Sequence, residues 1–124
     1  MMTEAALVFD ADGEAIYWHL PPGRSAVSLP DSRTLWEVLW EARGRLGGVA
    51  HTHPGGGPAI PSETDLTTFA AIEAALGSRL KWVIATSSDV ATYEWLGPQK
   101  LGYQRIAAGT FEWVGRLRAL SLEV

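Results

Sequence analysis

Two histidines, His51 and His53, stand one residue apart near the middle of the chain, and a proline follows them. In an extended backbone, residues i and i+2 point to the same side, so both imidazoles can reach one ion. Asp65 lies twelve residues beyond His53, and the glycines and prolines of residues 55–61 can turn the chain back. Two imidazoles and one carboxylate suit zinc, and three protein ligands leave the fourth tetrahedral position for water. The sequence therefore predicts one Zn²⁺ per chain, held by His51, His53 and Asp65.

Each of these residues also has an interpretation without chemistry. A histidine pair on a strand is often an ordinary surface pair. Ser62 and Asp65 have the S-x-x-[DE] spacing of a helix N-cap and its partner, which stabilise a helix by about 0.5 to 2 kcal/mol without any metal. The glycines at 55–57 are then only a flexible loop, and His19 is a packing or surface residue. The conjunction of paired histidines, glycine-rich loop, serine and aspartate favours the metal site.

The composition limits the other functions open to the chain. There is no cysteine among its 124 residues, which excludes disulfide scaffolds, cysteine-based zinc fingers and thiol nucleophiles. The formal net charge of -4 argues against a nucleic-acid partner, because such a protein needs a basic surface. No apolar stretch approaches the roughly 20 residues of a membrane span, and no signal peptide is recognisable. We expect a soluble, cytoplasmic protein with a hydrophobic core in one domain, residues 1–124.

The first half of the chain predicts two strands and a helix. Residues 5–9 and 14–20 form a hairpin around a turn at 10–13, and residues 26–29 are a candidate short strand. Thr34 and Glu37 have capping-box spacing, which predicts a helix over residues 34–46 that ends at Gly47 and Gly48. The apolar residues that follow then lead into the two histidines.

The second half continues the alternation of helices and strands. A helix is predicted from Ser62 to a stop at Gly77, followed by strands over residues 80–86 and 90–96. The tail is ambiguous: Trp113, Leu117 and Leu120 fit a helix, whereas Leu120, Leu122 and Val124 alternate as in a strand. This order predicts a mixed α/β (α+β) fold, with a central mixed sheet packed by two main helices.

At the histidines and the following helix start, the sequence resembles the JAMM (MPN-plus) zinc metallopeptidases, in particular their compact prokaryotic JAB-type members. The family signature is an upstream glutamate, H-x-H-P, six residues and S-x-x-D. Here His51-Thr52-His53-Pro54 is followed by seven residues and then by Ser62-Glu63-Thr64-Asp65. Glycines can absorb the extra residue by adopting φ values closed to other residues. The resemblance covers roughly residues 3–96 and implies a single MPN-like domain with cytidine-deaminase-like layering.

The resemblance also implies a reaction and a role for each residue. His51, His53 and Asp65 match the zinc ligands, Ser62 matches the serine that supports the oxyanion, and Glu4 takes the place of the glutamate that acts as general base and acid. A mobile terminal Glu4, with Glu14 as the base, is the alternative. The expected activity is zinc-dependent hydrolysis of a peptide or isopeptide bond. Ubiquitin-like tails and sulfur-carrier adducts are among the compatible substrates.

A non-catalytic MPN-type domain that binds proteins as a scaffold is the competing function. The sequence retains all of His51, His53, Ser62 and Asp65. A scaffold has no physical need of the complete set, so we favour the peptidase. The oligomeric state is not indicated by the sequence.

Overall fold

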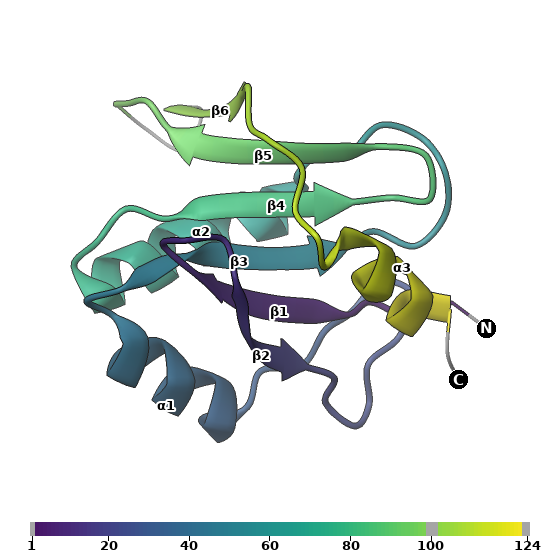
Figure 1. Cartoon of the computed structure of the whole chain (residues 1–124), viewed down its shortest axis with the longest axis horizontal. Helices are drawn as coiled ribbons and strands as arrows, with labels where there is room; N and C mark the ends of the chain where they lie inside the picture. The colour runs from purple at the N-terminus through teal and green to yellow at the C-terminus, as the bar shows by residue number, and fades with distance from the viewer. Residues whose placement is uncertain (1, 99–101, 123–124) are drawn as a thin grey trace.

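The computed structural model describes residues 2–98 and 102–122, and a six-stranded sheet lies at its centre (Figure 1). The strands are β1 (Ala6–Asp10), β2 (Ala15–His19), β3 (Leu46–Thr52), β4 (Lys81–Ala85), β5 (Val90–Trp95) and β6 (Tyr103–Ile106). They lie in the order β2-β1-β3-β4-β5-β6; β3 and β4 are parallel, and the other neighbouring pairs are antiparallel. The mixed α/β class expected from the sequence is confirmed.

The helices of the described residues cover both faces of the sheet (Figure 1). They are α1 (Arg33–Ala42), α2 (Glu63–Leu76) and α3 (Val114–Leu122). Leu39 of α1 and Phe69 of α2 belong to one core cluster, and Leu117 of α3 belongs to a second. Consecutive β1 residues alternate between the clusters, Leu7 with α3 and Val8 with α1 and α2, because strand side chains point to opposite faces in turn. The sheet is therefore buried on both sides, and α3 is a helix in addition to the two main ones predicted.

The helix α2 forms where the sequence predicts it. Ser62 is its N-cap, and its hydroxyl oxygen accepts a bond from the Asp65 N–H at 3.0 Å. Gly77 ends the helix with φ 69°, a left-handed conformation that glycine adopts without steric cost. The cap at Ser62 therefore fixes the first turn of α2, which carries Asp65.

The helix α1 starts and ends earlier than predicted. Ser32 is the N-cap, and its side chain accepts from the Leu35 N–H at 3.0 Å, so Thr34 is not the cap. Glu37 pairs with Arg33 at 2.8 Å across one exposed turn and does not reach back to a cap. The capping-box spacing therefore predicted a helix at the right place in the chain, but it put the N-cap two residues after Ser32, the true one.

Gly47 and Gly48 do not stop a helix; they lie inside β3. A Cβ at Gly47 would lie 2.2 Å from the Asp10 carbonyl oxygen, and one at Gly48 would lie 1.8 Å from the Lys81 carbonyl oxygen. The strands on both sides therefore approach β3 closely enough to require glycine. A pair of glycines after an amphipathic run gives the same sequence signal as a helix end, which explains the error.

Two other expectations are corrected at the edges of the fold. Residues 26–29 form no strand; they belong to an irregular connection, residues 20–32, that we call the strap. The ambiguous tail is helical as α3, because its apolar residues pack on the sheet; Val124 lies outside the described residues. The edge strand β6 was not predicted.

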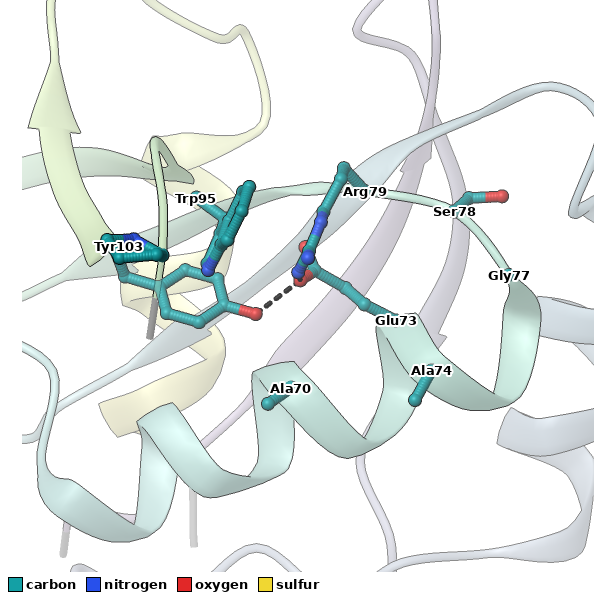
Figure 2. A pocket seen from close by; sticks show the side chains of 9 residues that line it. Ala70, Glu73, Ala74, Gly77, Ser78, Arg79, Trp95 and Tyr103 are labelled. Carbon is teal, nitrogen blue, oxygen red and sulfur yellow. Dashed lines mark hydrogen bonds and ion pairs between the residues drawn. The ribbon is translucent and has the colours of Figure 1, made fainter. Parts of the chain in front are cut away.

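A buried carboxylate joins α2 to β4 and β6 on the face that α2 covers. The Glu73 side chain is 2% exposed and accepts bonds from Arg79 Nη1 at 2.9 Å, the Leu80 N–H at 2.8 Å and Trp82 Nε1 at 3.0 Å. The Tyr103 hydroxyl donates a fourth bond (Figure 2). The cluster borders a hollow of about 490 Å³, but its carboxylate is fully occupied by donors within the fold. We therefore assign Glu73 a structural role.

Candidate metal centre

The two histidines lie where β3 ends, in the middle of the sheet. His51 is in β3 opposite Ala6 of β1, and the His53 N–H donates to the Ala85 carbonyl at the end of the parallel β4, at 3.0 Å. Since β3 has neighbours on both sides, the backbone that presents the imidazoles is fixed. The first turn of α2 brings Asp65 to the same place.

The three side chains converge on one point. His51 Nε2 lies 3.1 Å from His53 Nε2, His53 Nε2 lies 2.9 Å from Asp65 Oδ2, and His51 Nε2 lies 3.3 Å from Asp65 Oδ1. Tetrahedral zinc with bonds of about 2.0 to 2.1 Å separates its ligand atoms by roughly 3.3 Å. The donor set and its spacing therefore fit a metal ion such as zinc.

The two imidazoles face the same carboxylate and each other. A neutral imidazole carries a proton on only one ring nitrogen, and an ionised carboxylate only accepts. The Nε2 atoms of His51 and His53 each face one oxygen of Asp65, and they lie 3.1 Å from each other. A cation in the place of the two protons would be bound by lone pairs of all three side chains.

The electrostatics at neutral pH favour a cation. Burial would raise the pKa of the Asp65 carboxyl, but hydrogen bonds from His51 and His53 outweigh it and hold the pKa well below its usual range. The hydrogen bond to Asp65 raises the pKa of His53, against the opposing effect of burial. Asp65 is consequently a charged ligand throughout the physiological range.

The glycine-rich loop between His53 and Ser62 is tied to the turn between β4 and β5. The Thr86 hydroxyl donates to the Gly57 carbonyl at 2.7 Å, and the Ala59 N–H donates to Asp89 Oδ2 at 2.8 Å. Gly55 and Gly57 have φ of 106° and 107°, values that other residues rarely adopt. The seven-residue loop thus closes with its glycines in the special conformations expected of them.

Ser62 stands at the edge of the metal centre. Its N–H donates to Asp65 Oδ2 at 2.9 Å, and its hydroxyl oxygen accepts from the Asp65 N–H. The hydroxyl proton is not used in this capping box, so it can be donated toward the cleft. The N-cap interpretation of Ser62 and its functional interpretation are therefore compatible.

The two candidate glutamates lie at opposite ends of β1. Ala6 faces His51 in the antiparallel register, so Glu4, two residues earlier, falls beside His53. Burial raises the pKa of Glu4, and the neighbouring His51 and His53 partly offset that effect. Glu14 lies exposed beyond the far end of β1, where its N–H donates to Asp10 in the hairpin turn. Glu4 lines the same cleft as the histidines, and Glu14 is not among the residues that line it.

A cleft of about 680 Å³ opens beside these residues. Glu4, His51, His53, Ser62 and Asp65 are among the residues that line it. The strap and the helices α1 and α2 supply an otherwise mainly apolar wall, with Val27, Leu29, Trp36 and Ile72 among its members. The cleft therefore connects the three converging side chains to an apolar surface.

Sequence reasoning missed the residues that fasten the strap over the cleft. His19 is buried, and its Nε2 donates to the Pro30 carbonyl at 2.7 Å, while Arg24 donates to the carbonyls of Glu4 and Leu120. His19 is thus a packing residue, as expected. Contacts to backbone carbonyls leave no recognisable motif, so the strap offered no signal for Arg24.

A family model described as prokaryotic homologs of the JAB domain matches residues 4–96. That range contains the glutamate, the histidines, the serine and the aspartate of the site, and it ends before α3. No curated protein matches the chain. None of the helices in residues 2–98 and 102–122 has the length and apolar character needed to span a bilayer.

Proposed function

Because the chain belongs to the family of prokaryotic JAB-domain homologs, and its histidines and aspartate converge in a cleft, we propose that it is a zinc-dependent peptidase or isopeptidase. The single observation that carries the proposal is that His51, His53 and Asp65 meet at one point in a cleft that Glu4 and Ser62 also line. The ligand set alone supports only metal binding. The added carboxylate and hydroxyl support hydrolysis.

Zinc, when bound by His51, His53 and Asp65, supplies a Lewis acid that polarises a carbonyl and lowers the pKa of water toward 7. The remaining functions belong to side chains of this chain. Glu4 accepts a proton from the attacking water and donates one to the leaving amine, for which a carboxylate with a raised pKa is suited. Ser62 donates its hydroxyl proton to the oxyanion that develops on the substrate carbonyl.

The cleft supports a polypeptide substrate. Its apolar wall offers burial to the side chains of an extended segment, and the groups that would act on the amide line the same cleft. We propose a peptide or protein substrate that enters as an extended chain, a ubiquitin-like or sulfur-carrier tail being one form of it. The net charge of -4 gives no support to a nucleic-acid partner, and a cytoplasmic location remains our expectation.

Metal analysis combined with a peptide-cleavage screen tests the proposal. The purified protein is expected to retain one zinc per chain and to hydrolyse an amide bond in a chelator-sensitive manner. A His53→Ala, Asp65→Ala double variant should lose both properties, since one imidazole remains. Glu14→Gln serves as the matched control for changes in surface charge and should retain both.

Two outcomes of this experiment contradict the proposal. Stoichiometric zinc in the double variant would remove the ligand assignment. Stoichiometric zinc in the parent protein without cleavage of any peptide or isopeptide would favour the non-catalytic scaffold domain instead.

A further inference from the structure

Glu4 lies outside the sheet, although only one residue separates it from β1. The ladder between the N-terminal segment and β3 begins at Ala5, whose N–H donates to the Thr52 hydroxyl at 2.9 Å and whose carbonyl accepts from the Thr52 N–H at 2.9 Å. The register with β3 directs Glu4 toward His53, but the bonds that hold the Glu4 backbone itself come from elsewhere. A backbone position beyond the last bond of a ladder stays in place only if other contacts restrain it.

The strap supplies those contacts on both sides of the Glu4 backbone. The Glu4 N–H donates to the Ser25 carbonyl at 2.7 Å, and the Glu4 carbonyl accepts from Arg24 Nη1 at 3.2 Å. Two consecutive residues of the strap, Arg24 and Ser25, thus bond to both the N–H and the carbonyl of Glu4. The direction in which the Glu4 side chain leaves the backbone is fixed by these bonds.

Arg24 also connects Glu4 to the last helix. The same Nη1 atom donates to the Leu120 carbonyl at 3.3 Å, in the last turn of α3. The Thr3 N–H donates to the Ser121 carbonyl at 2.7 Å. Carbonyls in the last turn of a helix lack intrahelical partners and attract cations, so Arg24 and Thr3 satisfy α3 while α3 restrains them.

We propose that Arg24 is a positioning residue that holds Glu4 at the metal centre by joining its carbonyl to the C-terminal end of α3. The inference rests on the proposed function, because it gives Glu4 its role in proton transfer. It adds an element that lies outside the residues matched by the family model, since α3 begins at Val114. The last helix is in this view part of the support of the active site.

The consequence for catalysis follows from the distance over which a proton moves. A general base acts within about 2.6 to 3.2 Å of its proton, and misplacement by about 1 Å can reduce a rate by roughly 100-fold. The proposed zinc ligands come from β3, the residue that follows it, and α2, and they make no contact with Arg24 among the described hydrogen bonds. Loss of Arg24 should therefore lower kcat and leave zinc affinity and KM close to those of the parent.

Arg24→Met and Arg24→Lys form the test pair. Methionine keeps an unbranched side chain but has no donor. Both bonds of Arg24 are donated by the single atom Nη1. Lysine is shorter, but its one nitrogen carries three N–H donors and can make both bonds. Arg118→Met is the stability control. Arg118 lies on α3, the helix that Arg24 contacts, and it also donates to two carbonyls, those of Thr86 and Asp89.

The measurements are hydrogen exchange of the Glu4 amide, zinc affinity, and kcat and KM below the unfolding temperature. In Arg24→Met we expect the protection factor of the Glu4 amide to fall at least 10-fold. We also expect kcat to fall about 10- to 100-fold. Arg24→Lys should recover most of both. Arg118→Met should lower the unfolding temperature and leave the Glu4 amide protected.

Unchanged protection of the Glu4 amide in Arg24→Met overturns the inference, and so does unchanged kcat. A fall in zinc affinity that parallels the fall in kcat also overturns it, because the residue would then support the whole site and not Glu4. If the parent protein cleaves no amide bond, the proposed function fails. The amide exchange then still decides whether Arg24 restrains Glu4.

Discussion

Ser62 and Asp65 close a capping box at the start of α2 with the same carboxylate that faces both histidines. Asp65 Oδ2 lies 2.9 Å from the Ser62 nitrogen and 2.9 Å from His53 Nε2, while Oδ1 faces His51. The helix cap therefore orients the metal ligand. The capping and metal-binding interpretations of the S-x-x-D spacing describe one arrangement.

This arrangement predicts different results for two substitutions of Asp65. Asp65→Asn keeps an oxygen for the Ser62 N–H but loses the charge, so zinc affinity should fall at least 100-fold. The zinc-free protein should also lose some stability at neutral pH, because the bonds from His51 and His53 that hold the Asp65 pKa low favour the charged carboxylate. Asp65→Ala removes the cap partner as well and should cost a further 0.5 to 2 kcal/mol or so of unfolding free energy. Isothermal titration with zinc and denaturant unfolding of the zinc-free variants measure the two effects. Equal zinc affinity in Asp65→Asn and the parent would contradict the ligand role.

Ser62 is expected to act in the reaction and not in metal binding. Removal of one donor to an oxyanion typically costs about 2.7 to 4 kcal/mol, so Ser62→Ala should reduce kcat by about 100- to 1000-fold with zinc retained. Ser62→Gly is the matched variant, because glycine costs only a few tenths of a kcal/mol at an N-cap and also lacks the hydroxyl. Ser62→Thr keeps the hydroxyl and should retain much of the rate. If Ser62→Gly cleaves as fast as the parent, Ser62 is only a cap.

The general-base assignment predicts opposite results for two glutamates. Glu4→Gln keeps the size of the side chain but loses the proton acceptor, so kcat should fall by two to four orders of magnitude with zinc binding unchanged. Glu14→Gln should be nearly silent because Glu14 is exposed at the other end of β1. Steady-state cleavage rates of the two variants check this ranking. The reverse ranking would move the base to Glu14 and invalidate the register assigned to β1.

The raised pKa of Glu4 predicts a pH-dependent cost to the stability of the zinc-free protein. Burial makes the ionised form less favourable in the folded chain than in the unfolded chain, so the cost begins as pH rises through the unfolded-state pKa and is full only above the folded-state pKa. Glu4→Gln should consequently unfold at a higher temperature than the parent at pH 7. The difference should vanish below about pH 4, where Glu4 is neutral in both states. Thermal unfolding in chelator across this range tests the sign.

The sequence was sufficient where one short segment contained the whole signal. Ser62, Asp65 and the stop at Gly77 predicted α2 and its ligand, because caps and ligand are local to the helix. Gly47 and Gly48 were misassigned because their requirement comes from Asp10 and Lys81 on neighbouring strands. Close approach between strands depends on tertiary packing, which a single segment does not specify.

The supports of the site were beyond sequence reasoning for a similar reason. Arg24 donates to the backbone carbonyls of Glu4 and Leu120, which lie 20 and 96 positions away from it in the sequence. Any residue type can supply a carbonyl, so neither partner can be recognised from its type. Glu73 shares a helix with polar surface residues, and only the fold shows that its position faces Trp82 and Tyr103. Residue types therefore identified the chemical groups, whereas the residues that hold them in place required the three-dimensional structure.

Glu73 gives the last prediction, which concerns stability alone. Its carboxylate accepts four bonds, from Arg79, Leu80, Trp82 and Tyr103, and glutamine would present an amide N–H₂ to donors that need an acceptor. Glu73→Gln should therefore lower the unfolding free energy by about 3 kcal/mol, since buried donors lose their partner. Glu41→Gln is the control on the exposed surface of α1 and should stay within about 0.5 kcal/mol of the parent.

Zinc affinity should be retained in folded Glu73→Gln, because eight residues of helix place Glu73 about 12 Å along α2 from Asp65. Denaturant unfolding and zinc titration on the same samples separate the two properties. A loss of less than 1 kcal/mol in Glu73→Gln would show that the buried carboxylate is not the main link of α2 to β4 and β6. A loss of zinc affinity without loss of stability would instead connect Glu73 to the metal centre, against the structural role assigned to it.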